Sequence, residues 1–96
     1  MFEIEITESA QLDLEEAYLY YETQRVGLGD DMHLCYEEGL EVIRRNPYFE
    51  IRLDDIRAYK IRRFPYLIFF RIIDNKIRVV SFFFGKRKPS IWKERI

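Results

Sequence analysis

The side chains best able to do chemistry in this sequence are the cations of its second half. Residues 1–50 carry 13 acidic and 3 basic residues, a net charge of −10, whereas residues 51–96 carry 4 acidic and 13 basic residues, a net charge of +9. A charge split of this size predicts one acidic surface and one basic surface. We expect the basic surface to bind an anionic partner, either nucleic acid or an acidic stretch of protein.

Other reactive side chains are scarce. The single histidine, His33, lies in an acidic stretch, where we expect it to face solvent or cap a helix. The single cysteine, Cys35, has no neighbouring cation to activate its thiolate and is expected to be buried. A single cysteine excludes a disulfide framework within the chain. One cysteine and one histidine are also too few ligands for a typical structural metal site. We expect no cofactor.

Composition predicts one globular domain spanning residues 1–96. Hydrophobic residues make up 48% and aromatic residues 17% of the chain, which is enough to build a dense core. The longest nearly apolar run, Phe64 to Phe70, is far shorter than the roughly 20 residues that cross a bilayer. The first residues show no export signal, so we expect a cytoplasmic protein without a membrane partner.

The first half predicts a strand followed by two helices. Phe2, Ile4 and Ile6 alternate with glutamates, which is typical of a half-buried strand. Thr7 or Ser9 can cap the first helix. Its predicted apolar stripe consists of Ala10, Leu14, Ala17, Tyr18 and Tyr21, with Asp13, Glu15, Glu16 and Glu22 on the other sides. Residues 26–30 read as a turn, because their glycines lack the spacing and the Lys-Ser/Thr of a phosphate loop.

The second predicted helix carries an apolar stripe and ends at Asn46-Pro47. That stripe consists of Met32, Cys35, Tyr36, Leu40 and Ile43, and we expect Gly39 to allow close packing against the first helix. The two helices therefore form an antiparallel hairpin with an acidic outer face.

The second half predicts three antiparallel strands, at residues 56–63, 66–73 and 77–84, with a turn at Asp74-Asn75-Lys76. Residues 90–96 follow as a final helical turn. The predicted class is α+β: an N-terminal strand, a two-helix hairpin on one side of the sheet, a three-stranded meander and a short helical tail. By alternation, Val80, Phe82 and Phe84 share one face, which we expect to be exposed and to bind a partner.

Seven segments together carry a resemblance to a known family. They are Ile4-x-Ile6-Thr7-x-x-Ala10-x-x-Asp13-Leu14, Tyr20-Tyr21, Gly29, Asn46-Pro47, Ile56-Arg57, Arg63-Phe64-Pro65-Tyr66 and Arg87-x-Pro89-x-x-Trp92. In this order they resemble toxins of the RelE/ParE superfamily of bacterial type II toxin–antitoxin systems, and the last two favour the ParE-like branch. The resemblance implies a small cytoplasmic toxin that is neutralised by a cognate antitoxin.

Two modes of action are known in that superfamily, and both use one fold. ParE-like members are described as inhibitors of DNA gyrase, whereas RelE-like members cleave messenger RNA on the ribosome. Family members often carry a histidine where this chain has Phe84, and an aspartate where it has Lys88. The missing histidine removes the strand residue best suited to general acid–base catalysis, which favours a toxin that binds rather than an enzyme.

The favoured hypothesis is that cations and apolar side chains bind the target or an acidic and apolar antitoxin segment. The residues proposed for this are Arg57, Lys60, Arg63, Val80, Phe82, Phe84, Arg87, Trp92 and Arg95. The alternative is a ribosome-dependent endonuclease in which Lys60, Arg62, Arg63 and Arg87 contact the phosphate. Two further hypotheses stay open. Either the cations of the strands only keep the surface solvated, or the protein has lost its toxicity and now serves as a binding module.

Overall fold

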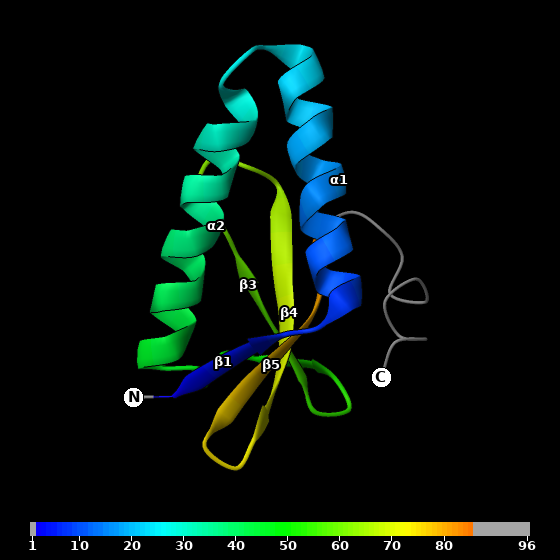
Figure 1. Ribbon diagram of the computed structural model, residues 1–96. Helices are drawn as coiled ribbons and strands as arrows, with labels where there is room; N and C mark the ends of the chain where they lie inside the picture. The colour runs from blue at the N-terminus through cyan, green and yellow to red at the C-terminus, as the bar shows by residue number, and fades with distance from the viewer. Residues whose placement is uncertain (1, 86–96) are drawn as a thin grey trace.

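The computed structural model, which describes residues 2–85, packs two helices against one face of a mixed sheet (Figure 1). In chain order the elements are β1 (Glu3–Ile6), α1 (Glu8–Gln24), α2 (Leu28–Arg45), β2 (Ile51–Leu53), β3 (Ile56–Lys60), β4 (Tyr66–Ile73) and β5 (Lys76–Phe84). The described part of the sheet has the order β1-β5-β4-β3-β2. Strand β1 runs parallel to β5, and the other neighbours are antiparallel. The predicted α+β class is confirmed.

Side-chain caps define the ends of the helical hairpin. Thr7 has an extended backbone and its hydroxyl accepts the N–H of Ala10 at 3.2 Å, which begins α1. Gly27 turns the chain with a φ of 90°, a conformation that glycine adopts without a steric penalty. The Glu22 carboxylate then accepts the N–H groups of Gly27 and Gly29 at 3.1 and 3.0 Å, so the end of α1 caps the start of α2.

Two glycines set how closely the layers approach. A Cβ on Gly29 would lie 2.8 Å from the Tyr18 carbonyl oxygen, so this residue allows the two helices to meet. A Cβ on Gly39 would instead lie 3.1 Å from side-chain atoms of Ile68 and Tyr59, on the sheet. The expectation that Gly39 packs against the first helix is therefore wrong, because its side of α2 faces β3 and β4.

The sheet is buried on both faces. The main core lies between helices and sheet and includes Cys35 and Tyr36, as predicted. A second cluster occupies the other face and consists of Ile56, Ala58, Phe69, Val80 and Phe83, with Leu53 and Leu67 packed against it. Phe83 is only 4% exposed. The expected exposed aromatic ring on that face is thus absent from the described residues.

A β-bulge overturns the expected common face of Val80, Phe82 and Phe84. Phe69 pairs with Ser81 and Phe70 with Val79, so Val80 is an extra residue in β5. The extra residue reverses the alternation: Val80 points away from the helices, whereas Phe82 points toward them and is 1% exposed. Of the three, only Phe84, at the end of the strand, is exposed.

The structure departs from the predicted elements at two strands, and one further predicted element lies outside the described residues. The short strand β2 was not predicted. The strand expected over residues 56–63 ends at Lys60, and Arg63 turns the chain with a φ of 68°. The helical turn expected for residues 90–96 falls outside the described residues. Among the described helices, none has the length and apolar character needed to cross a membrane.

Candidate binding surfaces

Those predicted basic residues that lie within residues 2–85 do not gather into one patch. Arg57 is half-buried; its Nη1 donates to the Phe49 carbonyl oxygen at 2.7 Å, and its guanidinium lies 5.6 Å from the Tyr48 ring centroid. Lys60 lies on the face that points away from the helices, because it pairs with Leu67 of the second cluster. Arg63 lies beside the helical hairpin, 3.9 Å from Asp31.

Acidic and basic side chains interleave across the described surface. Arg62 donates twice to Glu38 of α2, at 2.6 and 3.0 Å, and Arg78 donates to Glu5 of the neighbouring β1 at 2.6 Å. The hydrogen bonds from these arginines lower the pKa of Glu38 and of Glu5. Among residues 2–85, the expected separation into one acidic and one basic surface is not found, because β1 lies beside β5 and α2 beside the end of β3.

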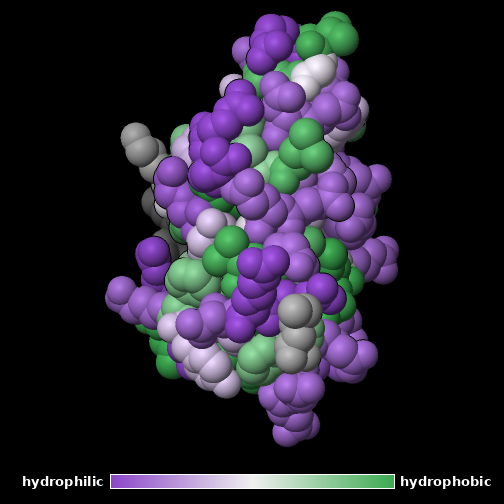
Figure 2. Space-filling view, turned by 90° about the vertical axis from the view of Figure 1, so that its left-hand side faces the viewer, coloured by the Kyte–Doolittle hydropathy of each residue, from purple (hydrophilic) through white to green (hydrophobic). Residues whose placement is uncertain are grey.

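Figure 2 views the molecule from the α2 side. Figure 2 shows a largely hydrophilic surface on which hydrophobic groups are small and separate. Another ion pair joins Arg71 of β4 to Asp55, with the shorter contact at 2.7 Å. The hydrogen bond from Arg71 lowers the pKa of Asp55. Isolated exposed pairs of this type contribute little individually, on the order of 0–1 kcal/mol.

Two exposed cations do share a groove. Arg52, Lys60, Pro65, Leu67 and Gly85 line a depression of about 310 Å³, which we call the basic groove. Within the described part of the chain, neither Arg52 nor Lys60 has a carboxylate at ion-pair distance. Leu67 and Pro65 add apolar surface, so the groove can bind carboxylates and aliphatic groups together.

A second groove is lined mainly by aromatic rings. Glu16, Tyr20, Tyr21, Pro65, Tyr66 and Phe84 line a depression of about 460 Å³, which we call the aromatic groove. Tyr20 is 55% and Phe84 37% exposed. Tyr66 stacks on Phe82 at 4.9 Å and meets Phe84 edge to face at 6.0 Å, so it joins this groove to the core. Sequence reasoning did not find the groove, although it singled out Tyr20-Tyr21 and the segment ending at Tyr66.

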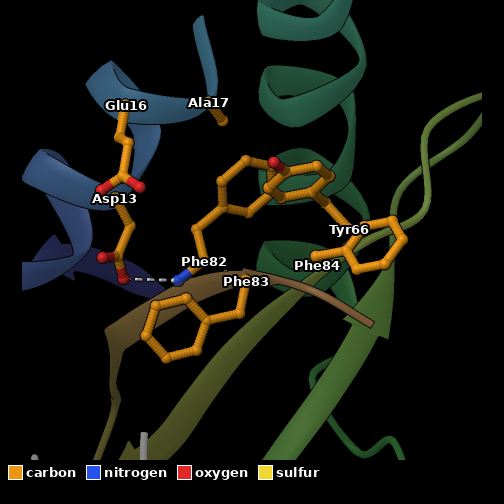
Figure 3. A pocket seen from close by; sticks show the side chains of 7 residues that line it. All are labelled: Asp13, Glu16, Ala17, Tyr66, Phe82, Phe83 and Phe84. Atoms are coloured by element: carbon orange, nitrogen blue, oxygen red, sulfur yellow. Dashed lines mark hydrogen bonds between the residues drawn. The ribbon is translucent and has the colours of Figure 1, made fainter. Parts of the chain in front are cut away.

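Asp13 is a further residue whose role was missed. It was expected on the polar side of the first helix, but it is 8% exposed and its Oδ2 accepts the Phe82 N–H at 3.1 Å (Figure 3). Strand β1 pairs with β5 only as far as Val79, so α1 supplies an acceptor where that pairing stops. The helical spacing of Ala10, Asp13 and Ala17 was the available signal, since it places Asp13 on the buried stripe.

The remaining candidates have simple positions. His33 lies on α2 with its Nδ1 3.1 Å from Glu37, and it is partly exposed, as predicted. The described residues contain no cluster of three His, Cys, Asp or Glu side chains that could hold a metal ion. Arg87, Lys88, Trp92 and Arg95 lie outside the described residues.

Comparison with known proteins identifies the class. Residues 4–89 match the model of the family described as "ParE toxin of type II toxin-antitoxin system, parDE". Because the match covers most of the 96 residues, the chain belongs to the ParE toxin family. The resemblance to the ParE-like branch is thereby confirmed.

The solved structures agree at the level of the fold. A chain of the structure titled "Chromosomal ParDE TA system from P. aeruginosa" superposes with a TM-score of 0.76 and 16% sequence identity. The alignment covers 85% of this chain and 94% of that chain. No curated protein sequence shows significant similarity.

Proposed function

We propose that this toxin acts in the cytoplasm by binding DNA gyrase, and that a cognate antitoxin neutralises it by direct contact. The match of residues 4–89 to the ParE toxin model is the observation that carries the proposal. The structural neighbour belongs to a ParDE toxin–antitoxin system, which supports an antitoxin as partner. Binding of this kind blocks growth without any chemical step on the toxin.

The geometry supports binding over RNA cleavage. Cleavage by an adjacent 2′-hydroxyl needs a base, an acid and cations that converge on one phosphate. Lys60 faces away from the helices, whereas Arg62 and Arg63 lie near Glu38 and Asp31 of α2. Phe84 occupies the position where relatives often have histidine, and it packs against Tyr66. The described residues thus bring no such set together.

The basic groove supports an antitoxin segment that is both acidic and apolar. Arg52 and Lys60 would face its carboxylates, while Leu67 and Pro65 would contact its aliphatic side chains. Arg57 and Arg63 lie elsewhere on the surface and are proposed as separate contacts. Arg87, Trp92 and Arg95 are proposed contacts with the target.

Induction of the gene in a bacterial host tests the proposal. We expect DNA-damage signalling and filamentation while protein synthesis continues. Prompt arrest of protein synthesis with cut transcripts would contradict it and would support the ribosome-dependent endonuclease. Normal growth despite a folded product would also contradict it and would indicate a binding module without toxicity.

A further inference from the structure

Arg57 of β3 differs from the arginines of β4 and β5 in having no carboxylate partner. Arg71 of β4 pairs with Asp55, and Arg78 of β5 pairs with Glu5. Within the described part of the chain, no carboxylate lies at ion-pair distance from the half-buried Arg57. A half-buried cation loses part of its hydration, so an anionic group that binds to it compensates for that loss.

Two uncharged groups hold the Arg57 guanidinium in position. Its Nη1 donates to the Phe49 carbonyl oxygen at 2.7 Å, and its central carbon lies 5.6 Å from the centroid of the Tyr48 ring. A guanidinium has five N–H groups, so several remain to donate to both oxygens of a carboxylate. Because these contacts already orient the side chain, binding of an anion costs little further side-chain entropy.

Exposed apolar side chains lie beside this cation, and we call Phe2, Tyr48, Ile51 and Arg57 together the Arg57 patch. Tyr48 is 66% and Ile51 is 48% exposed. Phe2 meets the Tyr48 ring edge to face at 6.1 Å. Ile51 pairs with Arg57 across β2 and β3, which places both side chains on one face of the sheet. An arginine and a tyrosine among apolar groups are typical of the residues that dominate protein–protein binding.

The charges next to the patch favour a single carboxylate over a polyanion. Glu3 follows Phe2 in the sequence, Glu50 precedes Ile51, and both glutamates are exposed. A nucleic acid would bring several phosphates toward these carboxylates, and its binding normally depends on several cations. A single carboxylate with apolar neighbours instead matches one fixed guanidinium with an apolar rim.

We propose that the Arg57 patch binds an aspartate or glutamate side chain of a partner protein, flanked there by apolar side chains. The guanidinium donates to the carboxylate, while the apolar members of the patch contact the flanking groups. Arg57 lies on the helix side of the sheet with its pairing partner Phe70, whereas Lys60 lies on the other face, so the patch is separate from the basic groove. The proposal rests on the proposed function only in taking a protein as the partner.

Titration of the full chain with three small probes tests the proposal by NMR. The probes are Ac-Ile-Glu-Ile-NH₂, its neutral analogue Ac-Ile-Gln-Ile-NH₂ and a thymidine hexanucleotide. We expect the glutamate peptide to shift the Arg57 Nε and Tyr48 ring signals, and to bind at least about threefold more tightly than the glutamine peptide. Equal affinities of the two peptides, or an absence of shifts at these signals, would overturn the proposal. Tighter binding of the hexanucleotide at the same signals would overturn it in favour of a nucleic-acid site.

Variants identify the groups that carry the preference. Arg57→Gln should abolish the preference for the glutamate peptide, and Arg57→Lys should reduce it, because lysine keeps the charge but not the fork. Tyr48→Leu should weaken binding of the glutamate peptide, whereas Tyr48→Phe should retain it because the ring remains. Arg25→Gln is the matched control and should change nothing, since Arg25 is an exposed arginine before the start of α2 and the patch follows the end of that helix.

Two further outcomes of these measurements would contradict the proposal. An unchanged preference in Arg57→Gln would do so, and if that variant does not fold, equal affinities of Tyr48→Leu and Tyr48→Phe decide against the site. Shifts of the Arg57 and Tyr48 signals in Glu94→Gln without any probe would make the chain's own tail the occupant. None of these measurements contains gyrase, so their failure is distinct from a failure of the proposed function.

Discussion

Asp13 joins the helical layer to the sheet through a single side chain. Its buried carboxylate accepts the Phe82 N–H beside the bulge at Val80, where the pairing of β1 with β5 has ended. A buried donor that loses its acceptor costs about 1–3 kcal/mol. The contact therefore satisfies a strand N–H that no strand neighbour pairs at this point.

Asp13→Ala should lower the free energy of unfolding by about 1–3 kcal/mol, because the Phe82 N–H stays buried without this acceptor. Asp13→Asn should cost less, since its amide oxygen can still accept. Urea unfolding followed by circular dichroism measures both. Glu15→Ala, on the exposed side of α1, is the control and should change stability by less than about 0.5 kcal/mol. Equal stability of Asp13→Ala and the parent would contradict this role.

The ion pair between Glu5 and Arg78 predicts a dependence of stability on pH. The hydrogen bond from Arg78 lowers the pKa of Glu5 below its ordinary value of 4.5. A lowered pKa in the folded state stabilises the protein above the unfolded pKa, and this stabilisation is lost as the pH falls through the folded pKa. Glu5→Gln should therefore lower Tm near neutral pH, and the difference should shrink as the pH falls below 4.5 and through the lowered pKa. A Tm difference that does not shrink as the pH falls would argue against the pair.

At the scale of elements, local patterns predict most of the fold. Strand β4 spans Tyr66–Ile73 as predicted, because its apolar run is bounded by Pro65 and by a turn at Asp74. Thr7 caps α1 as predicted. Strand β2 was missed because its three residues, Ile51–Leu53, are too few to establish a period of two, and the strand is defined by its pairing with β3. The bulge at Val80 was missed for a similar reason: it depends on contacts with β4.

The helical hairpin requires glycine at position 29, where α1 and α2 come into contact. Gly29→Ala should destabilise the fold by about 1–3 kcal/mol, because its Cβ would lie 2.8 Å from the Tyr18 backbone oxygen. Helix propensity alone would predict a gain of roughly 1 kcal/mol. Gly39→Ala is the comparison and should cost less, since its Cβ would meet side-chain atoms at 3.1 to 3.2 Å and no backbone atom that close. Urea unfolding of both variants gives the order, and a stabilised Gly29→Ala would contradict the close contact.

Across the part of the chain that the structure describes, the charge split along the sequence does not become a charge split in space. Arg62 and Arg78 come from the basic half but pair with Glu38 and Glu5 of the acidic half. The candidate site was therefore only partly predictable: Lys60 lies in the basic groove, while Arg57 and Arg63 lie apart. The aromatic groove combines three elements, and its residues become neighbours only through the tertiary fold.

Arg52 and Lys60 are the cations expected to hold the antitoxin. Replacing both with glutamate should weaken antitoxin binding about tenfold or more, because like charges would then face each other. Arg45→Glu is the control, since Arg45 is exposed at the end of α2 and does not line the groove. Calorimetry with the purified cognate antitoxin measures the affinities. The same affinity in the double variant and the parent would rule out the basic groove as its binding site.

DNA gyrase is the target that we propose for this ParE toxin. Gyrase-dependent supercoiling of a relaxed plasmid, with purified gyrase and increasing amounts of the purified chain, tests it most directly. We expect supercoiling activity to fall as the chain is added, and to return when the cognate antitoxin is added in excess. Full gyrase activity in the presence of a large excess of folded chain would contradict the claim.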